Sequence, residues 1–371
     1  MVMQYLAQAV RREVEDLKPY VPGLSIDDIR QRYGCENIVK MASNENALGV
    51  SPLVQERLKR AVSTVYRYPQ SGNPRLVQAI AQKYGIDSEC VVVSNGSDEL
   101  IDLLMRVRAV QHEDNIVCFK PCFGMYSVQA QICGLELRQA PLLDDFSLPF
   151  DDLLALVDEK TKIVFITTPD NPSGFCPEAE DVLKFAKALP STCLLVIDEA
   201  YMDFTDELKY SLLKQKVFLD NVVFLRTFSK SYGLAGIRLG YAIIPTVLAN
   251  YLWRARMPFS VNILAEEAGL AALEDKIFYE HSIQMVYIGR KQLSEGLQKL
   301  GCKVWKSHAN FIMFALPQDK NVSEVFEALL YKGFIIRALK SYDLPHLYRI
   351  TVGTAQENLD FLQAFAEVLQ K

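Results

Sequence analysis

The feature that most constrains the fold is the alternation of short, wholly apolar segments with longer stretches of helical periodicity. The apolar segments are CVVVS from residue 90, NIVCF from 115, KIVFITT from 162, CLLVID from 193 and NVVFLR from 221. Strands that are apolar along their whole length are typical of a mainly parallel sheet with helices on both faces. The pattern therefore predicts an α/β fold, with a large domain over residues 45–255 built on such a sheet.

The pattern changes from about residue 256. A helical stretch runs from Ile263 to Lys299, and the strand-like segments KVWKS, ANFIMFAL, GFIIRAL and LYRITVG follow, with helices between them. The segment TAQE, which begins at Thr354, fits a capping box with Glu357 as the reciprocal partner. We therefore expect a smaller α/β domain over residues 256–371.

The first 44 residues are predicted to be a helix followed by an arm that completes the smaller domain. Pro19 ends the helix. Its apolar residues recur at spacings of three and four: Met3, Leu6, Val10, Val14 and Leu17. Charged residues interrupt this segment at Arg11, Arg12 and Glu13, unlike the apolar core of a secretion signal.

Composition limits the classes of partner. The chain has 371 residues, half of them hydrophobic, and a formal charge of −5 with a pI near 5.6. Without a basic field or a Lys/Arg run it is not expected to bind nucleic acid or anionic lipid, and no apolar run reaches the ~18 residues of a membrane span. The eight cysteines show neither a CxxC pair nor zinc-ligand spacing, so we expect reduced thiols, a cytoplasmic location and no metal. Cys118 and Cys122, the nearest pair, are interpreted as core residues.

Polar segments follow four of the predicted strands, and ligands bind beyond the carboxyl ends of strands in an open parallel sheet. In SNGSDEL, Gly96 allows a tight turn, while Ser97 and Asp98 open a helix whose free N–H groups favour an anion such as phosphate. An ordinary helix N-cap would explain the same residues. The carboxylate of Asp98 would repel a phosphate, so only its backbone N–H could contribute.

The next two segments hold an amide and a carboxylate. In TTPDNPSG, Asn171 can donate to a ligand oxygen, although turn formation alone explains this segment. In DEAYMDF, Asp198 directly follows a buried strand, where a carboxylate is costly unless a cation or strong donor meets it. A helix cap is the alternative.

Lys230 completes the set in TFSKSYGLAGIRLGY. Most lysines are solvated, but this one follows a strand end and has Ser229 before it and Arg238 eight positions on (238 − 230 = 8), so its amine can act as a nucleophile toward an aldehyde. A lysine, an aspartate, an anion seat and an arginine together indicate a phosphorylated, cationic ring that carries an aldehyde. Pyridoxal 5′-phosphate fits this description.

With these residues in place, nearly the whole chain resembles the fold-type I pyridoxal-phosphate-dependent aminotransferases of the aspartate aminotransferase superfamily. The segments that carry the resemblance are LKPYVPG, MASNENALG, VYRYPQ, NGSDE, PCFGMY, TTPDNPSG, DEAYMDF, TFSKSYGLAGIRLGY and RITVGT. Each segment is weak alone, whereas their order and spacing are specific.

The resemblance implies roles for individual residues. Lys230 would bind the cofactor covalently and move the substrate proton, Asp198 would keep the ring nitrogen protonated, and Tyr201 with Asn171 would contact the ring's phenolic oxygen. The phosphate would be held by Ser97, Ser229 and Arg238. The backbone N–H groups that follow Gly96, including those of Ser97 and Asp98, would also bind it. Tyr68 would reach it from a second subunit, which implies a homodimer. Phe123 and Asp170 replace a more usual tyrosine and asparagine, so stacking on the ring remains but a hydroxyl role at residue 123 does not.

The resemblance also implies substrate contacts, at Arg349, Arg337, Tyr20 and Asn44. The fork of Arg349 suits a carboxylate or a phosphate, whereas a solvated arginine and a packing tyrosine equally explain Arg337 and Tyr20. The implied reaction exchanges the amino group between L-histidinol phosphate and 2-oxoglutarate, in histidine biosynthesis. Transamination of aromatic amino acids, decarboxylation of a phosphorylated amino acid and, in another class, a non-catalytic regulator remain alternatives.

Overall fold

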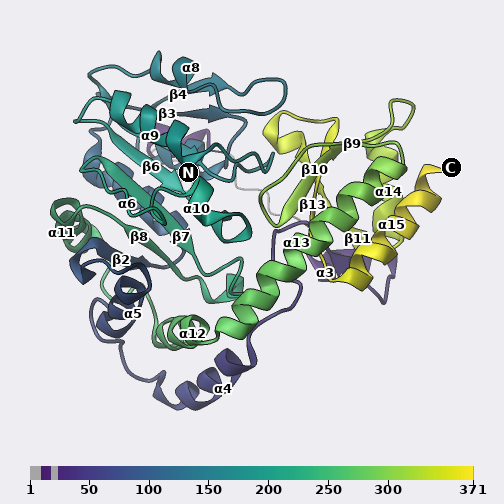
Figure 1. Cartoon of the computed structure of the whole chain (residues 1–371), viewed down its shortest axis with the longest axis horizontal. Helices are drawn as coiled ribbons and strands as arrows, with labels where there is room; N and C mark the ends of the chain where they lie inside the picture. The colour runs from purple at the N-terminus through teal and green to yellow at the C-terminus, as the bar shows by residue number, and fades with distance from the viewer. Residues whose placement is uncertain (1–9, 18–23, 371) are drawn as a thin grey trace, which may run out of the picture.

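A seven-stranded sheet forms the centre of the larger of two bodies in the computed structural model, which describes residues 10–17 and 24–370 (Figure 1). All of its strands run parallel except β8, which pairs antiparallel with both neighbours. In sheet order the strands are β2 Val91–Ser94, β8 Gly240–Ile243, β7 Val222–Thr227, β6 Leu194–Asp198, β5 Thr161–Thr167, β3 Asn115–Lys120 and β4 Glu136–Pro141. The predicted mainly parallel sheet is confirmed.

The two strands that sequence reasoning missed lack the signal it used. β4 is an edge strand whose residues are mostly half-buried or exposed. β8 is fully buried but only four residues long, and it begins with a glycine at the end of the segment that contains Lys230. Neither forms the long apolar run that marks a central strand covered on both faces.

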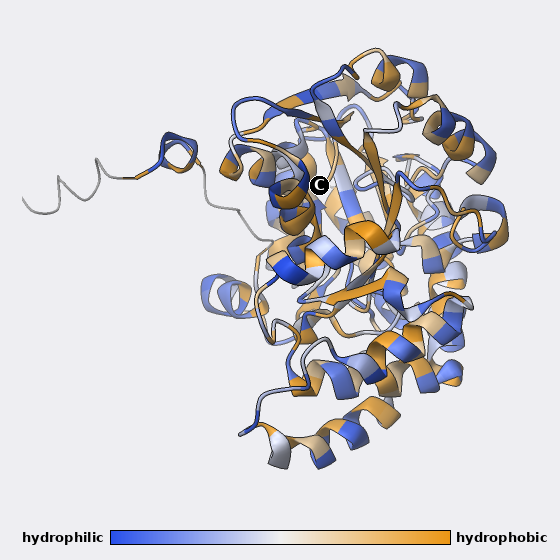
Figure 2. Ribbon diagram, turned by 90° about the vertical axis from the view of Figure 1, so that its left-hand side faces the viewer, coloured by the Kyte–Doolittle hydropathy of each residue, from blue (hydrophilic) through white to orange (hydrophobic). Residues whose placement is uncertain are grey.

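Helices cover both faces of the sheet because successive strand residues point in opposite directions. Val196 packs on one face with α6 Ser97–Arg108 and α11 Thr246–Ala255. Ile197 packs on the other with α5 Pro74–Tyr84, α9 Ala179–Ala188 and α12 Ile263–Glu274. Figure 2 shows the strands largely in the orange of hydrophobic residues. The helices of this body are α4 Pro52–Ala61, α5 Pro74–Tyr84, α6 Ser97–Arg108, α7 Met125–Ile132, α8 Phe150–Leu154, α9 Ala179–Ala188, α10 Glu207–Tyr210, α11 Thr246–Ala255 and α12 Ile263–Glu274. Shorter 3-10 helices are η1 Val62–Thr64, η2 Ser88–Cys90, η3 Met202–Phe204, η4 Ala235–Ile237 and η5 Leu339–Tyr342, the last in the smaller body.

The smaller body contains a four-stranded antiparallel sheet covered by helices. Its strands, in sheet order, are β12 Arg337–Ala338, β13 Leu347–Thr351, β10 Phe311–Ala315 and β9 Lys303–Val304. The helices are α13 Lys276–Lys299, α14 Val322–Tyr331 and α15 Ala355–Leu369. The predicted capping box is confirmed, because Thr354 and Glu357 each bind the other's backbone N–H at the start of α15.

The expected helix Ile263–Lys299 is broken at Asp275, which caps α13 by accepting a hydrogen bond from Phe278 N at 3.0 Å. α12 then packs in the core of the larger body, although the sequence had placed residues 256–371 in the smaller one. The reason is that α12 is apolar around most of its surface, which only a position between other elements can bury. Of the two helices α12 and α13, it is α13 that extends from the larger body to the smaller one (Figure 1).

The arm joins the smaller body through a short parallel strand pair. β1 Val39–Lys40 pairs with β11 Phe334–Ile335, and α3 Ile26–Tyr33 packs beside α14. In contrast, α2 Arg12–Glu15 lies against α7 of the larger body, where Arg11 donates to the carbonyl of Ile132 at 2.9 Å. Residues 1–9 and 18–23, which include the start of the predicted first helix and Tyr20, lie outside the described residues.

Within residues 10–17 and 24–370, no helix combines the length and apolarity needed to span a bilayer. The same residues contain no group of His, Cys, Asp or Glu side chains arranged to hold a metal ion. All eight cysteines are free thiols, and the Sγ atoms of Cys118 and Cys122 lie 3.7 Å apart. The hydrogen bond with Cys118, followed by burial, holds the pKa of Cys122 well above its usual value.

Candidate active site

The carboxyl ends of the central strands surround a cavity of about 140 Å³. β5, β6 and β7 end at Thr167, Asp198 and Thr227, and all three residues line it. The predicted residues that the structure brings together here are Ser97, Asp98, Phe123, Asn171, Asp198, Tyr201, Ser229, Lys230 and Arg238. Because they come from five separate loops and helix starts, only the parallel sheet places them side by side.

Lys230 lies in this cavity with little to hold its charge. Its Nζ donates to the carbonyl of Ser43, in the arm, at 3.4 Å and lies 5.7 Å from the centre of the Tyr201 ring. Burial, followed by repulsion from Arg349, lowers the pKa of Lys230 to about 8. A sizeable share of the amine is therefore neutral near physiological pH, as a nucleophile requires.

Asp198 is 3% exposed and makes only neutral contacts. Its carboxylate accepts hydrogen bonds from the Tyr126 hydroxyl at 3.0 Å and from Ala200 N at 3.1 Å. Burial raises the pKa of Asp198 to about 6. The contact with Ala200 agrees with the helix-cap alternative, but the raised pKa shows that a cation near this group would be stabilising.

Tyr126 and Thr167 were missed by sequence reasoning. Tyr126 is fully buried and shares a hydrogen bond of 2.7 Å with Thr167, besides the one it donates to Asp198. It lies on α7, three residues after Phe123, which the sequence had picked out as the ring-stacking residue. The signal was therefore only their closeness in the chain: Phe123 precedes α7, and its ring packs edge-to-face against the Tyr126 ring with centroids 5.8 Å apart.

The start of α6 has the properties of an anion seat. Gly96 precedes the helix with a φ of 77° and no side chain caps the free N–H groups, so the ordinary side-chain N-cap is excluded. Gly240 of β8 permits the close approach, since a Cβ there would lie 2.6 Å from Ser97 N. Arg238 lies 3.5 Å from Ser229 Oγ and 3.5 Å from an Asp98 oxygen. Burial raises the pKa of Asp98, and the nearby Arg238 opposes this shift.

The turn that holds Asn171 is braced from both sides. Asp170 is buried and accepts hydrogen bonds from the N–H and hydroxyl of Ser173, and burial raises its pKa to about 6. Arg349 donates to the side-chain oxygen of Asn171, and the Tyr342 hydroxyl lies 3.4 Å from the same atom. Because this oxygen is engaged by the smaller body, the amide NH₂ of Asn171 is left to face the cavity.

Arg349 itself is a buried cation held by neutral oxygens. Besides Asn171 it donates to the carbonyl of Ala42 at 3.1 Å, and its Nε has no hydrogen-bond partner in the part of the chain that the structure describes. No carboxylate of the described residues pairs with it. A buried guanidinium with an unpartnered N–H and no counter-ion is suited to bind an anion.

Asn44 contacts Tyr201 rather than projecting freely into the cavity. Its amide donates to the Tyr201 hydroxyl at 3.0 Å, and Thr351 accepts its backbone N–H at 2.9 Å. Burial raises the pKa of Tyr201, so its hydroxyl stays protonated and can donate to a ligand oxygen. The arm, the smaller body and the cavity thus meet at this contact.

Two other predicted residues lie away from the cavity. Tyr68 is 81% exposed and stacks on Phe259, with ring centroids 4.8 Å apart. Arg337 is paired with Arg349 in the register of β12 and β13, and it donates to Ser341 Oγ at 3.3 Å. The position of Tyr20 lies outside the described residues.

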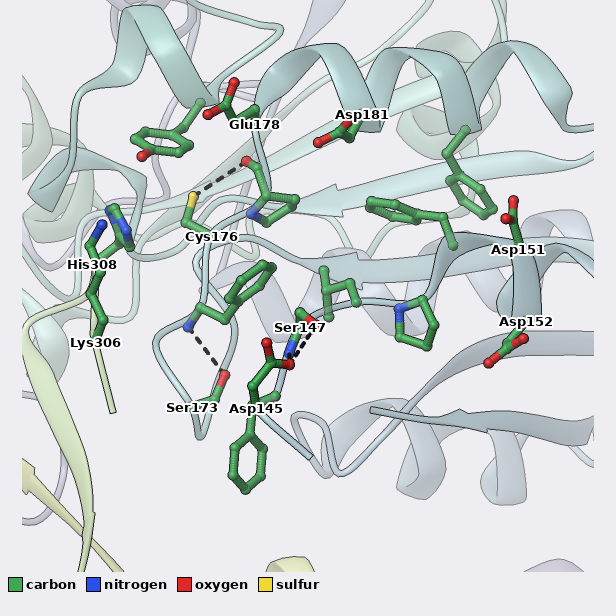
Figure 3. Close-up of a pocket in the computed structure, with 18 of the residues that line it drawn as sticks. Asp145, Ser147, Asp151, Asp152, Ser173, Cys176, Glu178, Asp181, Lys306 and His308 are labelled. Carbon is green, nitrogen blue, oxygen red and sulfur yellow. Dashed lines mark hydrogen bonds between the residues drawn. The ribbon is translucent and has the colours of Figure 1, made fainter. Parts of the chain in front are cut away.

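A larger groove of about 1140 Å³ is separate from this cavity, although the same turn borders both. Asn171 faces the cavity, whereas Ser173, Phe175 and Cys176 line the groove. Figure 3 shows acidic residues around the groove, among them Asp145, Asp151, Asp152, Glu178 and Asp181. Lys184 lines the groove but is exposed and paired with Glu180, so the smaller cavity, which holds the buried Lys230, is the candidate for catalysis.

The donor set of the cavity fits pyridoxal 5′-phosphate. The uncapped start of α6 and Arg238 provide donors for a dianion, and Asp198, with its pKa raised by burial, provides the acceptor for a protonated ring nitrogen. Lys230, with its lowered pKa, provides the amine for an aldehyde.

Comparison with known proteins identifies the class. The chain belongs to the family "Aminotransferase class I and II", whose model matches residues 36–365. It is a pyridoxal-phosphate-dependent transaminase, as the sequence resemblance implied.

The relatives share one name. The chain is 57% identical to the histidinol-phosphate aminotransferase of Nitratidesulfovibrio vulgaris over 97% of this chain and 96% of that one. It is 35% identical to the histidinol-phosphate aminotransferase of Methanococcus maripaludis over 97% and 98% of the two chains. Among solved structures, the histidinol-phosphate aminotransferase of Sinorhizobium meliloti in complex with pyridoxal-5′-phosphate matches with a TM-score of 0.88 and 25% identity, over 98% of both chains.

Proposed function

We propose that the protein exchanges the amino group between L-histidinol phosphate and 2-oxoglutarate, giving imidazole acetol phosphate and L-glutamate in histidine biosynthesis. The name shared by the relatives, at up to 57% identity over nearly the full chain, supports this substrate pair. The observation that carries it in the structure is Arg349, a buried guanidinium without a counter-ion beside the cofactor cavity. Both substrates are anions that such a fork can bind.

We assign the cofactor contacts as follows. The N–H groups of Ser97 and Asp98, the hydroxyl of Ser229 and Arg238 bind the phosphate, and Phe123 stacks on the ring. Asn171 and Tyr201 donate to the phenolic oxygen. When bound, pyridoxal phosphate supplies an aldehyde that takes up the amino group and a ring that accepts electrons.

Proton movement falls to residues of the chain. The Nζ of Lys230 holds the cofactor before the substrate arrives and then moves the proton to and from the substrate Cα. Asp198 keeps a proton on the ring nitrogen, and Tyr126 orients its carboxylate. Release of the proton from Cα is favoured as long as this nitrogen stays protonated.

For the substrate, Arg349 binds the carboxylate of glutamate or the phosphate of histidinol phosphate in turn. Asn44 orients Tyr201, and Arg337 and Tyr20 are proposed to contact the phosphate. The arm also lies close, since Ser43 contacts Lys230 and Ala42 contacts Arg349. Ligand binding is therefore expected to order the arm and the smaller body together.

We propose a homodimer in which Tyr68 reaches the phosphate of the second subunit. The support is that Tyr68 stacks on Phe259 and that both rings are exposed, as are other apolar side chains close to them in the chain: Val62, Val65, Tyr66 and Met257. Exposed apolar patches mark interfaces between chains. A cytoplasmic location is proposed from the eight free cysteines, since reduced thiols are typical of that compartment.

The test is a panel of first half-reactions, in which the purified holoenzyme is mixed with one amino donor and the change in cofactor absorbance is followed. Histidinol phosphate, glutamate, phenylalanine, tyrosine and phosphothreonine are compared, and the proposal predicts the highest kcat/KM for histidinol phosphate. A preference for an aromatic amino acid, or release of CO₂ from phosphothreonine, would overturn the substrate assignment. A regulator without catalysis would show binding but no half-reaction.

A further inference from the structure

A buried guanidinium gathers three carboxylates directly behind the catalytic cavity. Arg226, the second-last residue of β7, is 2% exposed and lies 2.8 Å from Glu199, 2.9 Å from Asp203 and 2.7 Å from Glu207. We call these four residues the Arg226 cluster. None of them lines the cavity that holds Lys230 and Asp198.

The cluster is attached to both catalytic segments at the next residue along the chain. Glu199 follows Asp198, and its carboxylate binds Arg226 and accepts a hydrogen bond from Ser211 at 2.7 Å. Ser231 follows Lys230, and its hydroxyl donates to Asp203. Because Glu199 directly follows Asp198 and Ser231 directly follows Lys230, an anchored side chain on either one also restrains the backbone of its catalytic neighbour.

The backbone alone does not provide this restraint. The ladder between β6 and β7 reaches Asp198, paired with Leu225, and its last hydrogen bond joins Glu199 N to Leu225 O at 2.9 Å. Lys230 lies beyond the end of β7, in a turn. The cluster therefore connects the two catalytic segments at the point where the sheet no longer does.

We propose that Arg226 is a positioning residue for transamination, which acts through Glu199 on Asp198 and through Asp203 and Ser231 on Lys230. This inference rests on the proposed roles of Lys230 and Asp198. Stability alone does not account for the arrangement, since apolar residues could fill the same space at less cost than buried ions. Catalysis does require it, because a displacement of about 1 Å in a reacting group can lower a rate about 100-fold.

The experiment uses holoenzyme variants that separate charge, geometry and attachment. Ser231→Ala removes the link to Lys230 and leaves the ion pairs of Arg226, whereas Arg226→Lys keeps the charge and loses the fork. Arg138→Lys is the matched control, because Arg138 also bridges two carboxylates, Glu136 and Asp158, at the far edge of the sheet. Measurements are kcat and KM, the rate of cofactor release, and the pH midpoint of the visible absorbance of the lysine-bound cofactor.

The proposal predicts that Ser231→Ala and Arg226→Lys each lower kcat about 10- to 100-fold with less than about a threefold change in KM. They also move the pH midpoint by about half a unit or more, since the environment of Lys230 changes. Arg138→Lys leaves all three measurements unchanged. If Ser231→Ala leaves both kcat and the pH midpoint of the visible absorbance unchanged, the proposal is overturned. This holds even if Arg226→Lys does not fold.

A separate variant tests the assumption beneath the proposal. Lys230→Ala should lose the visible absorbance of the lysine-bound cofactor. If it keeps that absorbance, the assignment of Lys230 is wrong, and the positioning role falls with it. If it loses the absorbance while Ser231→Ala behaves like the native protein, only the positioning role is refuted.

Discussion

Neighbouring residues in this chain occupy two buried environments of opposite design. Asp198 and Lys230 face the cofactor cavity and have no charged partner within hydrogen-bonding distance among the described residues. Glu199 and Ser231, one position further on in each segment, face the Arg226 cluster, where a guanidinium holds three carboxylates. In both segments the two kinds of side chain are adjacent in the chain, so the segments that follow β6 and β7 serve both environments.

The pKa values differ between the cavity and Asp203, although not at Glu199, where burial outweighs the attraction of Arg226 and raises the pKa to about 7. In the cavity, burial raises the pKa of Asp198 to about 6 and lowers the pKa of Lys230 to about 8, so both pKa values lie close to neutral pH. In the cluster, burial alone would raise the pKa of Asp203, but attraction to Arg226 and Lys83 outweighs burial and the pKa lies below its usual value. A buried charge with partners supports structure, whereas a buried charge without them is free to bind a ligand or move a proton.

The largest effect is expected at the unpaired lysine. Lys230→Ala should lower transamination by more than roughly 10⁴-fold, because it removes both the covalent anchor and the group that moves the proton. Turnover with histidinol phosphate and the visible spectrum measure it. Lys184→Ala is the control, since that lysine forms only exposed helix pairs with Glu180 and Asp181. Substantial activity in Lys230→Ala would remove the distinction between the two environments.

The paired environment should respond in stability. Arg226→Met leaves three buried or half-buried carboxylates without their cation, and we expect the free energy of unfolding to fall by about 3–5 kcal/mol. Urea unfolding of the cofactor-free protein measures it, with Arg138→Met as the control at a partly exposed site. A loss below about 1 kcal/mol would show that the cluster is not compensated in the way described.

Arg349 tests the opposite case, a buried arginine with neutral partners. Arg349→Met should lower kcat/KM for both substrates roughly 30- to 1,000-fold, which corresponds to a loss of about 2–4 kcal/mol of transition-state stabilisation. The free energy of unfolding should change little. The cause is the loss of the anion fork without the exposure of an unpaired carboxylate. Parallel kinetics and urea titrations of Arg226→Met and Arg349→Met decide whether the two arginines differ. Equal losses of stability would contradict the comparison.

The pH dependence of the cofactor-free protein should reveal Asp198. Its folded pKa of about 6 lies above the ordinary value of 3.8, so its stabilising contribution is present at low pH and is lost as the pH rises through about 6. Asp198→Asn removes this loss, and at pH 8 the variant should exceed the native protein by about 2–3 kcal/mol in unfolding free energy. The two proteins should agree near pH 4. A variant that is less stable than the native protein at pH 8 would rule out an uncompensated carboxylate.

The smallest effect is expected for Tyr126→Phe. The change removes one hydrogen bond to Asp198 and keeps the ring, so about 1 kcal/mol of stabilisation of the carboxylate is lost. The pKa of Asp198 should rise further, and kcat should fall several-fold at pH 8. A pH profile of the half-reaction measures both. If the profile does not move, the hydrogen bond does not orient the catalytic carboxylate.

The catalytic residues could be found from the sequence because they follow strongly apolar strands directly. Lys230, Asp198 and Gly96 each come within a few residues of a run that can only be a buried strand. Tyr126 could not be found in this way, because it reaches Asp198 from a helix 72 residues earlier in the chain. The contact between Asn44 and Tyr201 spans 157 residues and depends on how the arm crosses the larger body.

The Arg226 cluster was hidden for a related reason. Arg226 ends an apolar run, where sequence reasoning interprets a charged residue as the point at which the strand reaches solvent. Its burial follows only from the helical turns that carry Asp203 and Glu207 over the end of the sheet. The position of α12 was misassigned for the same reason, since helical periodicity does not show which body a helix packs against.

The sequence by itself determined the parallel sheet, the order of its apolar strands, the lysine and aspartate at their ends, and through these the cofactor class. These features are local, because strand periodicity and the turn residues after each strand act over a few positions. The tertiary structure alone decided which charges are paired. Asp198 and Glu199 are adjacent in the chain, and both carry a carboxylate. Only the packing of distant segments pairs Glu199 with the guanidinium of Arg226 and leaves Asp198 without a cation, so that it can bind a ligand.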